Sequence, residues 1–220
     1  MLIHYDVSTD PSLKGEMEEF ERKIREVHAN PNGWAKYGVE YKKDPNASTV
    51  LHYILTPAEF IEKKGMKGLS YYDPKTVEIR INYDNWMGKS KGNVNWFKSV
   101  DEYRTYVINH ETGHYIWDMH GAHGNAHLIN KRDKKGPCPV MIQQTKGREH
   151  CEPYDPNPYP IEDDMFVFSS MSGGGYEKKI NIVLIIIVMI VLMFIFFGNY
   201  SYYIDVVVST LNIMRKNKIM

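Results

Sequence analysis

The sequence of 220 residues carries no net charge, has only two cysteines and begins without a recognisable export signal. Its 27 basic side chains balance 27 acidic ones and form no basic stripe, so nucleic acid is not expected as a partner. Residues 1–6 contain neither a basic region nor an apolar run long enough for a secretory signal. Aromatic residues are abundant, with 16 tyrosines and 4 tryptophans, which favours an ordered core. The length fits one domain plus an appendage.

The most informative motif is a pair of histidines four residues apart, His110 and His114, with Glu111 beside the first. The apolar spacing of residues 101–116 predicts a helix, on which the two imidazoles would lie ~40° apart and point the same way. A catalytic zinc ion needs a third protein ligand and an open position for water. The spacing therefore predicts a zinc hydrolase site with Glu111 as the general base.

His120 is the predicted third ligand. It follows His110 by ten residues, too far round a continuous helix to join the pair, so the chain is expected to break after about Trp117 and swing back. Two more histidines, His123 and His127, are expected in a loop, with replacement of His120 as ligand as the alternative.

Gly113 interrupts the predicted helix at a cost of roughly 1 kcal/mol relative to alanine. A small residue there would be explained by another chain segment crowding the helix.

Elsewhere, alternating apolar residues predict strands at 2–7, 39–42, 49–55 and 76–82. Helical periodicity predicts a helix over 13–28 capped by Ser12, and a shorter helix over 57–64 that begins at a proline.

The pattern HExxHxxxxxH followed by a later methionine resembles the metzincin clan of zinc peptidases. More closely, residues 103–111 (YRTYVINHE) and 139–145 (PVMIQQT) resemble the DUF3152 family, a metzincin-like domain family. The likeness covers roughly residues 2–160 and also includes residues 33–34, 82–86, 157–160, Cys138 and Cys151.

The resemblance implies an α+β, metzincin-like zincin domain, in which a mixed sheet accompanies the helix of the active site. It also implies that Met141 forms a methionine turn, an apolar floor beneath the histidines that does not bind the metal. In one respect the sequence departs from the pattern, since Trp117 stands where metzincins have a glycine that turns the chain. This departure puts activity in question more than metal binding.

Cys138 and Cys151 flank the predicted methionine turn. Their spacing matches no zinc-binding pattern, so a disulfide is favoured. It would close a loop of about 14 residues and contribute roughly 3 kcal/mol in the chain-entropy model. A cytosolic domain would normally keep both thiols reduced, so reduced cysteines, export of the domain and a dedicated oxidising system on the cytosolic face all remain open.

The chain after the domain is predicted to enter a membrane. Residues 180–198 are almost wholly apolar and long enough for a transmembrane helix. Residues 161–179 would then be a tether and residues 199–220 a juxtamembrane tail, after a metallopeptidase domain at residues 1–160. Basic residues flank the span on both sides and do not settle its orientation, so a cell surface or a virion membrane remains possible.

Two functions fit these features. The first is a membrane-anchored zinc metallopeptidase, with zinc on His110, His114 and His120 and a peptide or protein as substrate. The alternative is a zincin-fold membrane protein with little or no activity and a structural or binding role, which Trp117 and the missing signal would support. Neither the cleavage specificity nor the oligomeric state can be read from the sequence.

Overall fold

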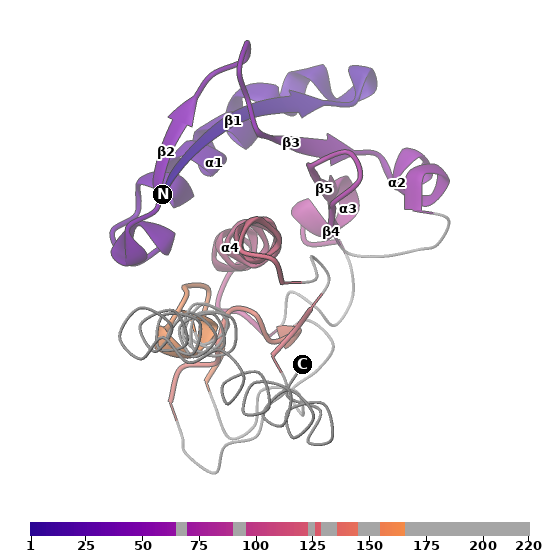
Figure 1. Cartoon of the computed structure of the whole chain (residues 1–220). Helices are drawn as coiled ribbons and strands as arrows, with labels where there is room; N and C mark the ends of the chain where they lie inside the picture. Colours follow the sequence, from indigo (N-terminus) through magenta and orange to yellow (C-terminus); the bar gives the residue numbers. More distant parts are fainter. Residues whose placement is uncertain (65–69, 90–95, 123–125, 129–135, 145–154, 166–220) are drawn as a thin grey trace, which may run out of the picture. The chain divides into compact units, whose positions relative to one another are not determined.

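The computed structural model describes residues 1–64, 70–89, 96–122, 126–128, 136–144 and 155–165 (Figure 1). The chain divides into two units, Met1–Met171 and Ser172–Met220, and every residue of the second lies outside the described ranges. The predicted membrane helix 180–198, the tail 199–220 and most of the tether 161–179 therefore fall outside them too. Of the helices in the described ranges, none has the length and apolar character needed to cross a membrane.

Five strands form one mixed sheet in the order β2-β1-β3-β5-β4. The strands are β1 (Leu2–Thr9), β2 (Glu40–Lys43), β3 (Val50–Leu55), β4 (Ser70–Asp73) and β5 (Glu78–Asn82). All neighbouring pairs are parallel except β4 with β5, which is antiparallel and places β4 at one edge. The strands predicted from alternation are confirmed with small shifts, whereas β4 was not anticipated.

One face of this sheet is buried beneath helices. On β1 the alternate residues Ile3, Tyr5 and Val7 are buried, and the same row continues through Val50, His52, Ile54, Ile79 and Ile81 on β3 and β5. This row packs against α1 (Met17–Ala29), which contributes Phe20, Ile24 and Val27 to the same core. Alternate residues of the strands therefore pack against the helix residues that lie three or four positions apart on one face of α1.

The predicted first helix differs at its start. A 3-10 helix, Pro11–Glu16, precedes α1, and Asp10, not Ser12, caps this 3-10 helix by accepting the backbone N–H of Ser12 at 2.8 Å. The N-cap residue of α1 itself, Glu16, makes no side-chain capping bond. The other helical segments within the described residues are α2 (Pro57–Lys64), α3 (Tyr83–Trp86), α4 (Val100–Met119) and the 3-10 turns Trp34–Tyr37 and Glu162–Met165.

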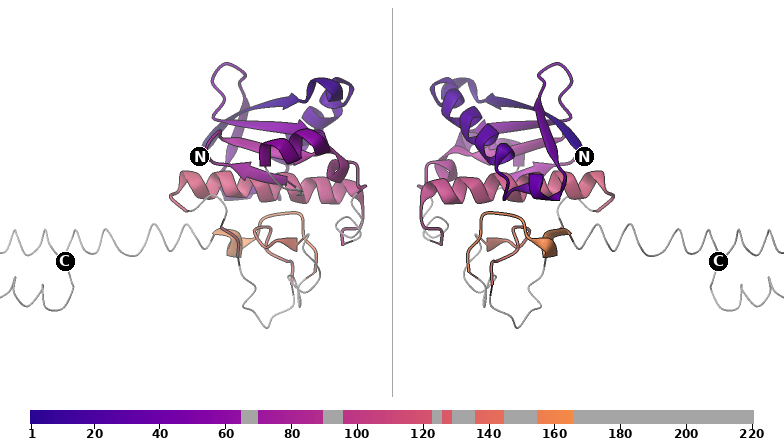
Figure 2. Two further views of the ribbon diagram at one scale, coloured as in Figure 1. Left: turned by 90° about the vertical axis from the view of Figure 1, so that its right-hand side faces the viewer. Right: turned by 90° about the vertical axis from the view of Figure 1, so that its left-hand side faces the viewer.

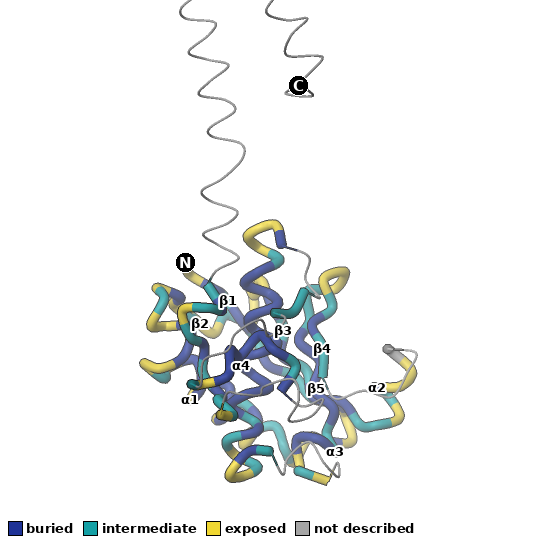
Figure 3. Tube along the Cα trace, turned by 90° about the horizontal axis from the view of Figure 1, so that it is seen from below, coloured by how far each residue is buried: buried dark blue, intermediate teal, exposed yellow. Residues whose placement is uncertain are grey.

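Helix α4 is covered on two sides. It contacts α1 and β4 on its sheet side, and the described parts of residues 136–165 lie on its opposite side (Figure 2). Every residue of α4 from Val107 to Trp117 is buried, which Figure 3 shows as a dark stretch through the middle of the molecule. A helix that is buried all round needs no polar face, so the contrast between an apolar and a polar side is weak along α4. Residues 161–165, predicted to begin the tether, instead belong to this packed layer.

Candidate metal centre

Local signals explain where α4 begins. Ser99 caps the helix by accepting the backbone N–H of Glu102 at 3.1 Å, and the Glu102 carboxylate accepts the N–H of Lys98 at 2.6 Å. The two bonds together satisfy backbone donors at the helix start. The cap fixes the start of the helix that carries His110, Glu111 and His114.

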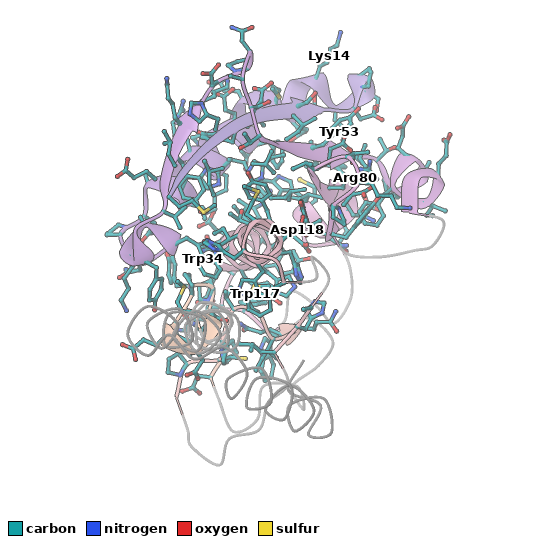
Figure 4. All side chains as sticks on the ribbon, viewed as in Figure 1. Lys14, Trp34, Tyr53, Arg80, Trp117 and Asp118 are labelled. Atoms are coloured by element: carbon teal, nitrogen blue, oxygen red, sulfur yellow. The ribbon has the colours of Figure 1, made fainter. Side chains whose placement is uncertain are left out.

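The expected break after Trp117 is wrong. Helix α4 continues to Met119, and the chain turns only at Gly121, whose φ of 79° is the left-handed conformation that glycine adopts at low cost. Trp117 stays inside the helix and is buried, and its indole N–H donates to the Asp164 carbonyl at 3.1 Å. Trp117 and Trp34 both lie beside α4 in Figure 4. The large side chain at position 117 therefore has a packed environment and need not sit in a turn.

His110 is held as a neutral imidazole with one nitrogen free to bind. Its Nδ1 lies 2.6 Å from the carbonyl oxygen of Val140, and a carbonyl only accepts, so Nδ1 carries the proton. Burial, and next the neighbouring His127, lower the pKa of His110 to about 3, against a smaller upward effect of the Val140 bond. The unprotonated Nε2 therefore presents its lone pair toward His114.

His114 faces the same point. Its Nε2 lies 3.2 Å from Nε2 of His110, and burial together with the other two imidazoles lowers its pKa well below the usual value. Its Nδ1 is buried and has no hydrogen-bond partner in the described part of the chain. Two neutral imidazoles thus converge from one turn of α4, as the sequence predicted.

The third histidine brought to this pair is His127, not the predicted His120. Among the described residues, His110, His114 and His127 each offer a nitrogen within 4.8 Å of the others. The His127 ring lies 4.6 Å from that of His114 and 5.2 Å from that of His110. His120 is exposed at the end of α4, because the unbroken helix carries it about 15 Å along the axis from His110. The structure thus brings His127 to the helical pair and leaves His120, the residue predicted for this place, outside the cluster.

The segment of His127 is tied to the chain around Met141. The backbone N–H of Leu128 donates to the carbonyl of Met141 at 3.1 Å, while Ala126 and Leu128 pack against the core on either side. A loop histidine is thereby fixed at a defined place. Sequence reasoning placed it in a loop, and only this pairing with the distant residue 141 could have distinguished it from His120.

Met141 packs against α4 at Gly113. A Cβ added to Gly113 would overlap the Met141 sulfur and approach Trp34 Cζ2 to 2.7 Å. Gly113 is thus explained as predicted, by chain segments that crowd the helix. Met141 is fully buried and its neighbour Val140 supplies the carbonyl that holds His110, so this turn supports the candidate site from below.

Glu111 is buried on α4 next to His110. The phenol of Tyr103 lies close enough to feel its charge: burial first, and then the Glu111 carboxylate, raise the Tyr103 pKa. Tyr106 is held by its O–H, which donates to the Ile142 carbonyl at 2.9 Å, and its ring packs beside that of His110. The carboxylate therefore sits in an aromatic, largely dry surrounding beside the histidines.

Cys138 is fully buried and bonded in a disulfide, but its predicted partner Cys151 lies outside the described residues. Asp164, which sequence reasoning missed, is fully buried, and burial raises its pKa to about 7 against the lowering effect of three backbone N–H donors. In the sequence it belongs to the acidic run Glu162–Asp164, which gives no sign that one of its members is buried.

Comparison with known proteins identifies the family. The sequence matches the family described as "Protein of unknown function (DUF3152)" over residues 2–168, and the chain belongs to that family. The predicted resemblance to DUF3152 is thereby confirmed, and its metzincin part stays a prediction. No curated protein and no solved structure matches the chain. The family description states no activity, so any chemical conclusion rests on the geometry of the histidines and Glu111.

Proposed function

We propose that this protein is a zinc-dependent peptidase that binds its metal through His110, His114 and His127 and uses Glu111 as general base. The observation that carries the proposal is the convergence of three imidazoles from two chain segments beside a buried glutamate. The HExxH part of the metzincin resemblance supports the helical pair and Glu111, whereas His127 stands outside that pattern, whose third histidine is His120. The mixed sheet with an antiparallel edge strand next to the buried helix also supports the proposal.

The donor atoms fit zinc. With Zn–N bonds of ~2.0–2.1 Å, two imidazole nitrogens at a tetrahedral angle are ~3.3 Å apart, close to the 3.2 Å between the Nε2 atoms of His110 and His114. Both rings are neutral, as ligands must be. The Val140 carbonyl orients His110 as outer hydrogen-bond partners commonly orient zinc-bound histidines.

When bound there, zinc would lower the pKa of a coordinated water toward ~7 and polarise a substrate carbonyl. The protein's own part belongs to Glu111, which would accept the proton of the attacking water and deliver it to the leaving amine. The aromatic neighbours Tyr103 and Tyr106 keep this region dry, which strengthens electrostatic interactions there.

The proposed substrate is an extended peptide. Strand β4 lies at the edge of the sheet, pairs with β5 on one side only among the described strands, and contacts α4. Its Tyr72 hydroxyl donates to the Asp118 carboxylate at 2.8 Å, which ties the edge to the helix that carries the histidines. A peptide added along β4 would use main-chain hydrogen bonds, a common form of peptide recognition. Attachment to a bilayer through residues 180–198 is proposed from their apolar sequence alone.

Metal analysis tests the centre. We expect the purified protein to bind one zinc ion, and His127→Ala to weaken zinc binding by more than the ~10–100-fold that loss of an outer-shell partner costs. The matched control, His120→Ala, should leave zinc affinity unchanged. Equal zinc binding by both variants and the original protein would show that the ion sits elsewhere or that His127 is not a ligand.

Activity is tested separately. Glu111→Gln keeps the size of the side chain and removes its basicity, so we expect zinc to remain bound while peptide hydrolysis falls by ~10²–10⁴. A peptide library assayed with the zinc-loaded protein and with the variant gives this ratio. Zinc binding without cleavage of any peptide would instead favour the structural or binding role.

A further inference from the structure

One buried carboxylate holds the turn beneath the histidines. The oxygens of Asp164 accept three backbone N–H groups: Met141 at 2.8 Å, Val140 at 3.0 Å and Ile161 at 2.7 Å. Asp164 is fully buried, so these bonds are shielded from water. This one side chain therefore fixes the backbone of Val140 and Met141.

The two fixed residues reach two of the three histidines. The carbonyl of Val140 accepts from Nδ1 of His110, and the carbonyl of Met141 accepts the N–H of Leu128, next to His127. A shift of this turn would therefore move the acceptor of one imidazole and the anchor of another. His114 depends on the turn less directly, because it is carried by α4 itself.

Asp164 is also attached to α4. Its own carbonyl accepts the indole N–H of Trp117 at 3.1 Å, and Trp117 follows His114 by three residues on the same helix. The side chain of Asp164 thus bonds the backbone of Val140 and Met141, while its backbone carbonyl bonds Trp117 of α4. One residue sets the separation between the two parts that supply the histidines.

We infer that Asp164 is a positioning residue for the metal centre, acting through the Val140 carbonyl on His110 and through Met141 on the segment of His127. This inference rests on the proposed zinc site. It assigns a role to a residue that touches neither the metal nor the substrate. Its consequence is that metal affinity depends on the acceptor capacity of a carboxylate in the last described helix.

Asp164→Asn tests the inference with little change in shape. The amide keeps one acceptor oxygen but turns an N–H₂ donor toward a backbone N–H, so at least one of the three bonds is lost. Three quantities are measured: zinc affinity by chelator competition, the visible absorption spectrum of the cobalt-loaded protein, and thermal unfolding of the metal-free protein. We expect zinc affinity to fall ~10–100-fold and the cobalt bands to shift, as loss of an outer-shell partner produces.

The matched control is Asp10→Asn. Asp10 is likewise buried and accepts a backbone N–H, that of Ser12, but it caps the 3-10 helix Pro11–Glu16. Lys14 of that helix lies far from Trp117 in Figure 4. We expect this variant to lower the unfolding temperature while leaving zinc affinity and the cobalt spectrum unchanged. A purely structural role of Asp164 would make the two variants behave alike.

The outcomes separate the two proposals. If the unaltered protein binds neither zinc nor cobalt, the proposed function fails. If it binds them and Asp164→Asn binds them equally well with the same spectrum, only the positioning role is overturned. Should Asp164→Asn fail to fold, Trp117→Phe decides, because it removes the bond to the Asp164 carbonyl and keeps an aromatic ring. We expect ~10-fold weaker zinc binding from Trp117→Phe, the low end of what loss of an outer-shell partner costs, and an unchanged affinity would overturn the inference.

Discussion

Gly113 lies where α4 meets two bulky side chains. The sulfur of Met141 and the ring of Trp34 approach so closely that a methyl group there would overlap both. Trp34 is held in turn, since its indole N–H donates to the Asn109 carbonyl at 2.9 Å. The helix therefore accepts the conformational cost of a mid-helix glycine in exchange for close packing beside His110 and His114.

Gly113→Ala should lower the free energy of unfolding although alanine favours helices. The gain of up to about 1 kcal/mol in helix propensity is outweighed by overpacking, which typically costs 1–3 kcal/mol. Denaturant unfolding of the metal-free protein measures the difference. Gly15→Ala is the control, because a Cβ at Gly15 meets nothing within 4 Å. A stabilised Gly113→Ala would mean that Trp34 and Met141 can move away.

The candidate site was predictable from sequence where it depends on one helix. The four-residue spacing of His110 and His114 and the place of Glu111 follow from helical geometry alone. His127 was not predictable, because its place depends on the hydrogen bond from Leu128 to Met141, thirteen residues further along. The burial of Asp164 was not predictable for the same reason, since two of its three donors, Val140 and Met141, lie 24 and 23 residues before it.

At the scale of elements, the layer between α1 and the sheet contains two unusual histidines. His28 of α1 and His52 of β3 are buried 5.0 Å apart, and none of their four ring nitrogens has a partner in the described part of the chain. Tyr41 stacks on His28 at 3.8 Å, and Tyr5 packs edge-on against both. Burial lowers the pKa of His52 to about 3, and burial together with His52 lowers that of His28 well below its usual value.

These histidines should make the fold acid-sensitive. Unfolded chains take up protons near pH 6.5, whereas the folded protein does so on His52 only near pH 3. The unfolded state therefore binds more protons in this window, and acidification lowers the free energy of unfolding by roughly 1.4 kcal/mol per pH unit for each histidine. Above about pH 6.5 the histidines are unprotonated in both the folded and the unfolded state, so this loss of stability is absent.

His52→Leu should reduce that dependence by the share of one histidine, as measured by denaturant unfolding between pH 4 and 8. Ile54→Val on the same strand is the control, because it removes one buried methylene and lowers stability by about 1 kcal/mol at every pH. An unchanged slope in His52→Leu would show that the imidazole is not kept neutral in the folded protein.

The elements themselves were predicted unevenly. Strands β1, β3 and β5 and helices α1, α2 and α4 follow from periodicity, and the mixed sheet agrees with the expected combination of strands and helices. Strand β4 has four residues, of which only Ser70 and Tyr72 share one face of the sheet. Two residues are too few to form a recognisable alternation of apolar and polar side chains. The end of α4 was misjudged because local sequence does not reveal that Trp117 is anchored by Asp164.

At the scale of the whole molecule, residues 155–165 join parts that are far apart in sequence. The backbone of Asn157 pairs with the side-chain amide of Gln144, and the Asn157 side chain donates to the Cys138 carbonyl. The carbonyl of Pro158 accepts from the side chain of Asn109 on α4. Together with Asp164, these contacts bind the turn and the helix into one unit. The family match reaches residue 168, in agreement with a folded unit that extends beyond the predicted boundary at 160.

Truncation tests this organisation. A chain ending at Met171 should keep the zinc affinity and unfolding temperature of the full chain, whereas one ending at Tyr154 should lose zinc binding because Asn157 and Asp164 are gone. Only the full chain should partition into lipid vesicles. Zinc binding by the shorter truncation would show that α4 and His127 suffice. Equal partitioning of the full chain and the chain ending at Met171 would contradict the proposed anchor.

The return of residues 155–165 to α4 has a consequence for synthesis. During translation the helix with its two histidines emerges well before Asp164, and until then the Val140 carbonyl is not locked against His110. Domains generally fold as units once their chain is available. The nascent polypeptide would thus bring its three histidines together in their final geometry only late in synthesis, after residue 164 has emerged.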